Sequence, residues 1–241
     1  MKTTIHRIAA AAMALLMAGA ATANHWKDVD YVGDGQTGHK LDIYTPDDGQ
    51  STHKVVVLIY GSAWFSNNSK VDAFKSYGQQ LLDAGFAVVS INHRASTEAK
   101  FPAQIQDVKA AIRYVRGNAS KYGLDTSFIG ITGYSSGGHL SSLAGTTNGV
   151  KTRKFDKVKV DIEGQLGQYT KESSAVNAVV DWFGPIDMSR MERCETYKDA
   201  NSPEAVIIGG PSAENPDMVR AMNPMSYIDK KDPMFLVIHG D

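Results

Sequence analysis

Short runs of apolar residues recur along this chain, with helical patterns between several of them. Continuous apolar runs occupy residues 55–60, 86–91, 128–132, 176–183 and 234–239. Runs of this length are typical of strands buried on both faces of a sheet. Their alternation with helical segments predicts an α/β fold with a mostly parallel central sheet and helices on both faces.

Other patterns indicate the elements between these strands. Residues 40–44 alternate apolar and polar side chains, which predicts a half-exposed strand. Pro102 and the apolar spacing that continues to Val115 predict a long helix, and residues 71–83 predict another. The polar stretch 151–172 is interpreted as a surface excursion without chemistry of its own.

Residues 187–227 form an insertion that resembles a cap. Ser202-Pro203 and Asn215-Pro216 each place a capping residue before a proline, which predicts two helix starts. An insertion at this place is expected to lie over the carboxyl edge of the sheet. Its methionines suit either a roof over a substrate or adaptable core packing.

The first 23 residues differ from the rest of the chain. Lys2 and Arg7 flank the start of an apolar segment, residues 8–18, that is too short to span a bilayer, and residues 21–23 form a small-x-small cleavage pattern. Residues 1–23 are therefore predicted to be a signal peptide, and residues 24–241 a single domain. The mature protein is expected to be secreted or periplasmic.

Charge and cysteine content exclude several classes of function. Without Lys2 and Arg7, 23 basic residues face 26 acidic ones, a formal charge of −3. This balance gives no reason to expect nucleic acid or an anionic membrane as partner, and no later segment is long and apolar enough for a membrane span. Cys194, the single cysteine, is interpreted as a small buried hydrophobe.

Residues 33–38 (GDGQTG) fit the glycine pattern of dinucleotide-binding loops. Such a loop needs a buried strand before it and a helix after it, so that the helix N-terminus holds a pyrophosphate. Here an alternating strand follows, which predicts a hairpin turn. We expect no cofactor at this turn, and no motif in the sequence indicates a metal.

A second glycine-rich segment, residues 133–137 (GYSSG), has the G-x-S-x-G pattern between a predicted strand and a helix-compatible run. A serine hydroxyl is a weak nucleophile and must be held at a sharp strand-to-helix turn where a base can reach it. The flanking glycines permit that turn. Ser135 is therefore the predicted nucleophile, and Ser136 falls one place too late in the pattern.

Several segments resemble those of α/β-hydrolases, in particular secreted bacterial esterases and lipases, a group that includes feruloyl and acetyl-xylan esterases. The similar segments cover most of the mature chain: LDIYTP, YGSAW, FPAQIQDVKAAIRYVRGNASKYGLD, GYSSGGHLSSLAG, VVDWFGPIDM and SPEAVIIGG. The resemblance implies a carboxylic ester hydrolase without a cofactor, acting through an acyl-enzyme on a small-molecule ester or an acylated saccharide.

In this family YGSAW corresponds to the oxyanion loop. The resemblance implies that the backbone N–H groups of Ser62 or Ala63, with that of Ser136, bind the oxyanion. Ser62 stands where the family often has glycine, and a serine resists positive φ, so the loop is expected to be strained or differently turned. Trp64 suits plain packing and a substrate-binding role equally.

The acid and the base of the triad are expected to follow Ser135, in that order. Only His139 and His239 follow it; the helix should carry His139 away from the nucleophile, and His239 suits a structural position at a strand end. His93 ends a buried strand at the catalytic edge but precedes the serine. In the family the strand that corresponds to residues 234–239 is the penultimate core strand and ends in a pattern like H-G-x-x-D, which places the acid two residues beyond Asp241 and the histidine later still.

Asp181, Asp187 and Asp241 are the alternative acids within the chain. Asp187 is a candidate substrate contact as well, although it suits a turn cap into the insertion better. The resemblance therefore implies that the last strand and helix, with the acid and the base, are missing from these 241 residues and that this chain alone is inactive.

Two other functions remain open. A serine peptidase of the same fold shares the sharp strand-to-helix turn that carries the nucleophile, and a non-catalytic binding protein could retain the scaffold without the triad.

Overall fold

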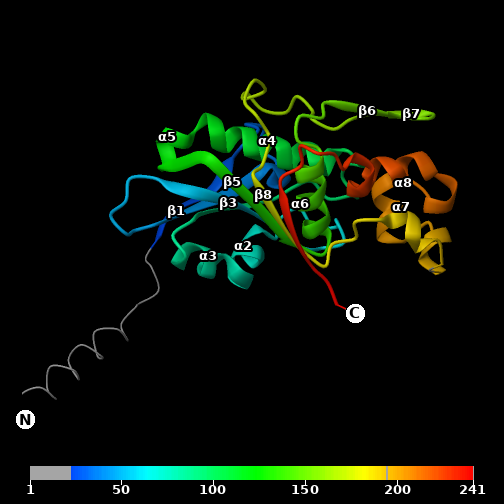
Figure 1. Ribbon diagram of the computed structural model, residues 1–241, viewed down its shortest axis with the longest axis horizontal. Helices are drawn as coiled ribbons and strands as arrows, with labels where there is room; N and C mark the ends of the chain where they lie inside the picture. The colour runs from blue at the N-terminus through cyan, green and yellow to red at the C-terminus, as the bar shows by residue number, and fades with distance from the viewer. Residues whose placement is uncertain (1–22, 194, 241) are drawn as a thin grey trace, which may run out of the picture.

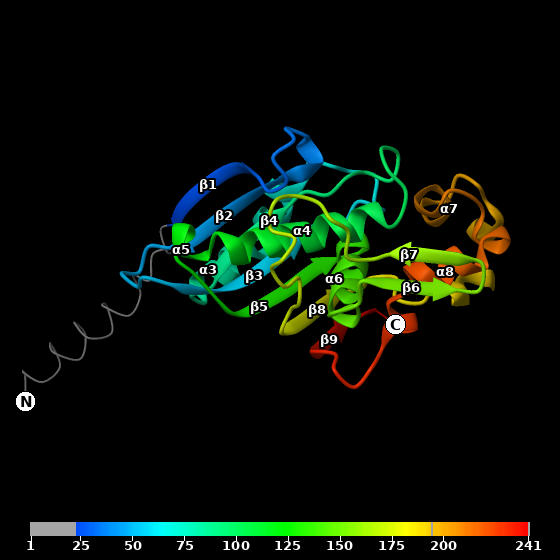
Figure 2. The same cartoon turned by 90° about the horizontal axis from the view of Figure 1, so that it is seen from above.

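The computed structural model describes residues 23–193 and 195–240. Its centre is a seven-stranded sheet in the order β1-β2-β4-β3-β5-β8-β9, seen from above in Figure 2. The strands are β1 (Ala23–Asp30), β2 (Lys40–Pro46), β3 (His53–Ile59), β4 (Ala87–Ile91), β5 (Leu124–Tyr134), β8 (Ala178–Trp182) and β9 (Met234–Ile238). Strand β2 is antiparallel to both of its neighbours, and the remaining pairs are parallel. The predicted fold class is confirmed.

Helices cover both faces of the sheet (Figure 1). One face carries α2 (Lys70–Ala73), the π-helical turn η2 (Phe74–Gly78) and α3 (Gln79–Asp83), which follow one another without a break. The other face carries α4 (Ala103–Gly117), α5 (Ala119–Tyr122) and α6 (Ser136–Thr146).

The insertion consists of short helices beside α6. They are η3 (Met188–Arg193), η4 (Glu195–Lys198), α7 (Pro203–Ile208), η5 (Ser212–Glu214), α8 (Pro216–Met222) and η6 (Pro224–Tyr227). Both predicted helix starts are found. The Ser202 hydroxyl accepts a hydrogen bond from the Ala205 amide and caps α7, whereas the Asn215 side chain donates to the Pro211 carbonyl.

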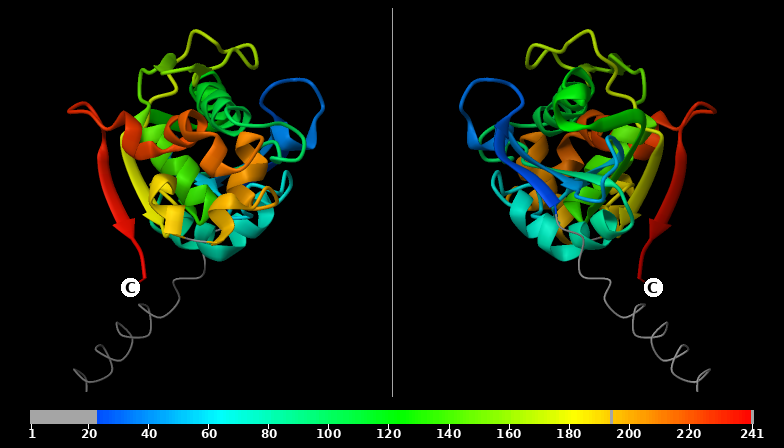
Figure 3. Two further views of the ribbon diagram at one scale, coloured as in Figure 1. Left: turned by 90° about the vertical axis from the view of Figure 1, so that its right-hand side faces the viewer. Right: turned by 90° about the vertical axis from the view of Figure 1, so that its left-hand side faces the viewer.

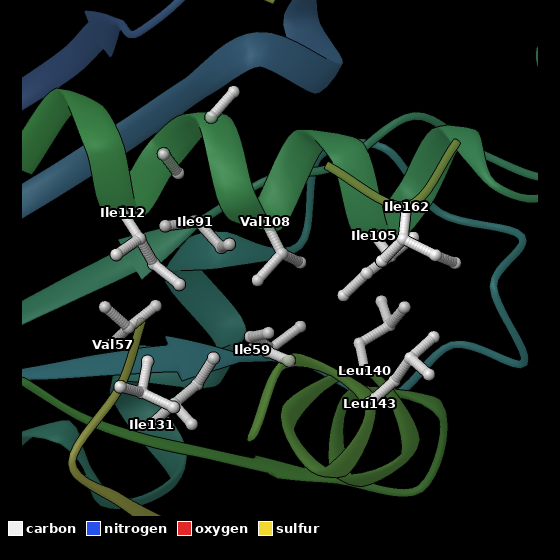
Figure 4. Packing of buried hydrophobic residues seen from close by; sticks show 14 of the residues in the cluster. Val57, Ile59, Ile91, Ile105, Val108, Ile112, Ile131, Leu140, Leu143 and Ile162 are labelled. Atoms are coloured by element: carbon white, nitrogen blue, oxygen red, sulfur yellow. The ribbon is translucent and has the colours of Figure 1, made fainter. Parts of the chain in front are cut away.

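The main core lies between the sheet and α4. Figure 4 shows Ile105, Val108 and Ile112 of α4 near Val57 and Ile59 of β3, and all five side chains are fully buried. Burying an aliphatic side chain of this size contributes about 1.5–3 kcal/mol. The helical spacing in the sequence therefore marks the face of α4 that fastens it to the sheet.

The expected half-exposed strand is wrong, because β2 is buried almost throughout. Its polar position Asp42 is fully buried, and its carboxylate lies 2.8 Å from Nζ of Lys70 at the start of α2. The charged residue in this strand thus belongs to a buried ion pair. Its partner is 28 positions away in sequence, so the alternation of apolar and polar residues within the strand could not predict the contact.

The expectation that residues 234–239 form a strand buried on both faces is also wrong. Strand β9 forms there, but its side chains are 36% exposed at Ile238 and up to 80% exposed at Met234. The reason is its place at the edge of the sheet, drawn in red in Figure 3. A groove of about 470 Å³ lies beside it, with Phe235 and Val237 among its lining residues.

The stretch 151–172 contains a hairpin of β6 (Thr152–Phe155) and β7 (Val158–Asp161). The segment is tied to α4, because Glu163 forms ion pairs with Lys109 and Arg113. Burial lowers the pKa of Lys109 despite the nearby carboxylate of Glu163. The segment 151–172 is therefore attached to α4 by a cluster of ion pairs among Glu163, Lys109 and Arg113, which the sequence pattern did not predict.

Residues 33–38 join β1 to the short turn η1 (Thr37–His39) and then to β2, so the hairpin prediction is confirmed. Gly33 and Gly35 adopt φ of +91° and +80°, and their amides donate to the Asp30 carboxylate.

No helix of residues 23–193 and 195–240 is long and apolar enough to cross a membrane. Almost all of the predicted signal peptide, with Cys194 and Asp241, lies outside the described residues.

Candidate active site

Ser135 is the single residue between the end of β5 and the start of α6. Its backbone has φ 54° and ψ −124°, a region that non-glycine residues rarely adopt. The Ser135 amide donates a 2.9 Å hydrogen bond to the carbonyl of Trp182 in β8, which holds the turn against the sheet. The strand-to-helix turn expected from G-x-S-x-G is therefore present, with the predicted nucleophile at its apex.

Glycines around this turn allow the backbone segments to approach closely. A Cβ on Gly137 would lie 2.3 Å from the carbonyl oxygen of Ile59 in β3. A Cβ on Gly61 would lie 2.6 Å from the carbonyl oxygen of Tyr134 and 2.8 Å from Cβ of Ser135. Any other residue at these positions would push the loop after β3 away from the nucleophile.

The loop after β3 makes a tight turn with an unusual backbone. Ala63 and Trp64 have φ of 50° and 61°, and the Phe65 amide donates to the Ser62 carbonyl at 2.9 Å. Two successive residues with positive φ in a turn cost of order 1 kcal/mol each for side chains with a Cβ. The strain expected at Ser62 thus falls on the next two residues.

The candidate oxyanion donors differ in their availability. The Ser62 amide donates to the hydroxyl oxygen of Ser136 at 2.9 Å. That amide is therefore engaged, which leaves the amides of Ala63 and Ser136 as the candidate pair. Ser136 opens α6, and the amides of a first helical turn lack acceptors within their own helix.

Trp64 is only 1% exposed, and its indole Nε1 donates to Nδ1 of His139 at 3.3 Å. The side chain thus points into the protein, and its predicted role in substrate binding stays a prediction. Phe65, the next residue, is 42% exposed and lies on the surface of the loop. Of the two neighbouring aromatic residues, Trp64 is therefore packed in the interior and Phe65 lies on the surface. The sequence pattern does not predict this difference.

His139 packs in the interior, as expected from its position in α6. Its imidazole is fully buried, and Nε2 lies 2.9 Å from the carbonyl oxygen of Met222 at the end of α8. Burial lowers its pKa to about 4, so the ring is neutral near pH 7. Both ring nitrogens are engaged, and His139 has no free nitrogen to offer Ser135.

Two of the three alternative acids, Asp181 and Asp187, form hydrogen bonds within the fold. The Asp181 carboxylate accepts bonds from the Ser142 hydroxyl at 2.6 Å and from the Gly184 amide at 2.8 Å. Asp187 accepts from the Ser189 amide at 3.1 Å and from the Asn223 side chain at 3.1 Å. Asp187 thus caps the turn into η3, and its predicted substrate contact is untested.

In residues 23–193 and 195–240, no carboxylate or imidazole is hydrogen-bonded to the Ser135 hydroxyl. The histidines of this region bond elsewhere: His25 to Asp42, His39 to Asp34 and Asp107, His53 to Asp48, His93 to the Arg94 carbonyl, His139 to Trp64 and Met222, and His239 to the Gly240 carbonyl. The described residues therefore contain a nucleophile turn and a candidate oxyanion loop, but no assembled triad.

A polar hollow of about 360 Å³ opens beside the oxyanion loop. It is lined chiefly by Ser62, Phe65, Asn67, Asn68, Thr97 and Glu98. The Asn67 amide donates to the Glu98 carboxylate, which also accepts from the Ala95 amide. An exposed aromatic ring beside amide, hydroxyl and carboxylate groups is suited to a polar ligand with many hydroxyls.

The strand order, the strand-to-helix turn at Ser135 and the loop after β3 together define an α/β-hydrolase fold. Residues 41–241 match the family model described as BD-FAE, and the chain belongs to this family. The sequence is 32% identical over 218 residues to esterase LipQ and 33% identical over 224 residues to the probable carboxylic ester hydrolase LipM, both from Mycobacterium tuberculosis.

These alignments cover 89% and 90% of this chain but 48% and 47% of the relatives. The chain thus spans about half the length of these curated relatives. Among solved structures, a bifunctional GH43-CE protein of Bacteroides eggerthii is 65% identical, with a TM-score of 0.88, over 90% of this chain and 28% of that one. A truncated carbohydrate esterase from gut microbiota is 56% identical, with a TM-score of 0.89, over 93% of this chain and 79% of that one.

Proposed function

We propose that this protein is a serine-dependent carboxylic ester hydrolase that works through an acyl-enzyme on Ser135. The observation that carries the proposal is the backbone of Ser135, held at φ 54° between β5 and α6 and in contact range of Gly61 in the loop after β3. Such strain persists where the surrounding structure maintains it, and it is typical of functional sites. Family membership and the esterase relatives support the same reaction class.

In the proposed reaction, the Ser135 oxygen bonds to the ester carbonyl carbon while a base takes the hydroxyl proton. The amides of Ala63 and Ser136 donate to the negatively charged carbonyl oxygen of the tetrahedral intermediate. The alcohol leaves with a proton returned by the base, and the acyl group stays on Ser135. Water then attacks the acyl-enzyme by the reverse proton route and releases the acid.

We further propose that the acid and the base come from residues outside the described part of the chain. The partners of the histidines within residues 23–193 and 195–240 support this proposal, since none of these histidines is hydrogen-bonded to Ser135. Chain 1–241 alone is then expected to hydrolyse esters poorly, because no base among residues 23–193 and 195–240 is placed to remove the Ser135 proton.

The proposed substrate is an acylated saccharide. The polar hollow next to Ser62 supports it, because its amides, hydroxyls and exposed Phe65 ring suit a sugar on the alcohol side of the ester. Of two solved proteins similar to this chain, one is named a carbohydrate esterase and the other a bifunctional GH43-CE protein. Export from the cytoplasm, inferred from residues 1–23, is proposed as well and is testable by N-terminal sequencing of the mature protein.

The test compares chain 1–241 with the complete gene product, using a fluorophosphonate probe and a panel of acetylated and feruloylated xylo-oligosaccharides. The complete protein should label rapidly and hydrolyse at least one ester, and Ser135→Ala should abolish both. Saccharide binding without hydrolysis or labelling would instead favour the non-catalytic binding protein. Cleavage of peptides in preference to esters would favour the peptidase.

A further inference from the structure

Two side chains on the first turn of α6 bond to the oxyanion loop at two points. The Ser136 hydroxyl accepts from the Ser62 amide at 2.9 Å, and Nδ1 of His139 accepts from the Trp64 indole at 3.3 Å. Ser136 and His139 are three residues apart and therefore lie on the same side of the helix. Ala63, the candidate oxyanion donor, lies between the two attachment points.

The backbone between these points requires such support. Ala63 and Trp64 both have positive φ, a conformation that residues with a Cβ leave unless surrounding contacts hold them. The Trp64 carbonyl also accepts from the Ser96 amide at 2.8 Å. Trp64 is therefore held at two points: its indole bonds to His139, and its backbone carbonyl bonds to Ser96.

His139 connects this loop to the insertion as well. Its Nε2 lies 2.9 Å from the Met222 carbonyl oxygen, which can only accept, so Nε2 carries the proton and Nδ1 is the acceptor. The adjacent Asn223 fastens the start of the insertion, because its side chain accepts from the Met188 amide and donates to Asp187. One neutral imidazole thus bonds the oxyanion loop on one side and the insertion on the other.

Few side chains can replace an imidazole in this place. The site requires an acceptor and a donor on opposite edges of one rigid group, in a fully buried position. An apolar residue would leave the Trp64 indole and the Met222 carbonyl without partners, and a lysine or arginine offers no acceptor. The Trp64 and His139 rings meet edge to face with centroids 5.2 Å apart, which adds a packing constraint.

We propose that His139 is a positioning residue for the oxyanion hole, one that holds the Ala63 amide in place through the Trp64 indole and couples this loop to the 187–227 insertion. The proposal rests on the proposed ester hydrolysis. His139 itself makes no contact with the reacting atoms. Its loss should therefore weaken stabilisation of the oxyanion while leaving ground-state binding of the ester nearly unchanged.

The kinetic test uses the complete gene product and three variants. His139→Leu removes both hydrogen bonds, Trp64→Phe removes only the indole N–H, and His139→Gln keeps an acceptor and a donor on one side chain. His139→Leu and Trp64→Phe should each lower kcat by about 10- to 100-fold, below the ~10²–10³ of a lost donor, with KM within about threefold. Together they should lower kcat no further than His139→Leu alone, and His139→Gln should recover at least half of the loss on a logarithmic scale.

Trp26→Phe is the matched control, because it removes an indole N–H from β1, where Trp26 packs against Tyr122. This variant should keep the wild-type kcat. Equal losses in kcat for Trp26→Phe and Trp64→Phe would overturn the proposal. So would an unchanged kcat in folded His139→Leu, or a change confined to KM.

A second readout does not depend on activity. The indole N–H resonance of Trp64 in a ¹H–¹⁵N spectrum, assigned by its loss in Trp64→Phe, should shift upfield in His139→Leu and return toward its position in His139→Gln. If no ester is hydrolysed but these shifts are found, the proposed function fails while the hydrogen-bonded link stands. An indole resonance that His139→Leu leaves unmoved rules out the link whatever the activity.

Discussion

The Asp181 carboxylate and the Ser142 hydroxyl form a fully buried hydrogen bond of 2.6 Å between β8 and α6. The same carboxylate accepts from the Gly184 amide at 2.8 Å. Asp181 therefore joins the helix that begins beside the nucleophile to the neighbouring strand. This arrangement makes it a structural acid, although it follows Ser135 in sequence as a triad acid would.

Removal of this acid should destabilise the fold. Asp181→Ala leaves two buried donors without an acceptor, and we expect the free energy of unfolding to fall by about 2–4 kcal/mol in urea titrations. Asp125→Ala, at a position where the side chain is 37% exposed, is the control and should change the free energy of unfolding far less. A loss below about 1 kcal/mol for Asp181→Ala would show that the contact contributes little.

Gly61→Ala should damage the site more than the fold. The added Cβ meets the Tyr134 carbonyl and the Ser135 side chain, so the loop after β3 must shift away from the nucleophile. We expect kcat/KM of the complete protein to fall by at least ~10-fold, since a displaced donor no longer matches the oxyanion. Gly130→Ala, where the added Cβ comes no closer than 3.3 Å to the Phe128 side chain, is the control and should retain wild-type kinetics.

Stability should decrease in mild acid because of His139. Its pKa is lowered to about 4 in the folded protein from an ordinary 6.5, by burial against two neutral partners, the Trp64 indole and the Met222 carbonyl. Between pH 6.5 and about 4 the unfolded chain binds more protons at this residue than the folded protein does. The free energy of unfolding therefore decreases as the pH is lowered, by roughly 3 kcal/mol in total.

The measurement is the difference in unfolding free energy between the wild type and His139→Gln from pH 7 to pH 4. Glutamine does not titrate, so this difference should shrink or change sign as the pH falls. A difference that stays constant over this range would mean that His139 does not account for the acid sensitivity.

Strand β9 should cause chain 1–241 to self-associate. Leu236 is 55% exposed and Met234 80% exposed on an edge strand whose backbone groups are open to pairing. Light scattering should show a mass that rises with concentration, and Leu236→Lys should reduce it. Asn201→Lys, in an exposed loop of the insertion, adds the same charge and should have no such effect.

Much of the fold follows from local patterns. The buried runs at residues 55–60, 86–91 and 128–132 all became central strands, and Pro102 with its apolar spacing marked α4. The burial of two outer strands was predicted wrongly: β2 is more buried than expected, and β9 is more exposed. Burial of Asp42 depends on Lys70, and exposure of Leu236 depends on the place of β9 in the sheet, and neither is a property of the segment itself.

The candidate site shows the same division. By itself, the sequence determined the class of fold, the turn at Ser135 and the loop that faces it, because glycine spacing and strand–turn–helix order are local requirements of the backbone. Only the tertiary structure decided that the Ser62 amide is occupied by Ser136, that Trp64 points inward, and that His139 joins the oxyanion loop to the insertion. These are contacts between segments up to 83 residues apart, and hydrogen bonding at such separations is determined by packing, which no local pattern encodes.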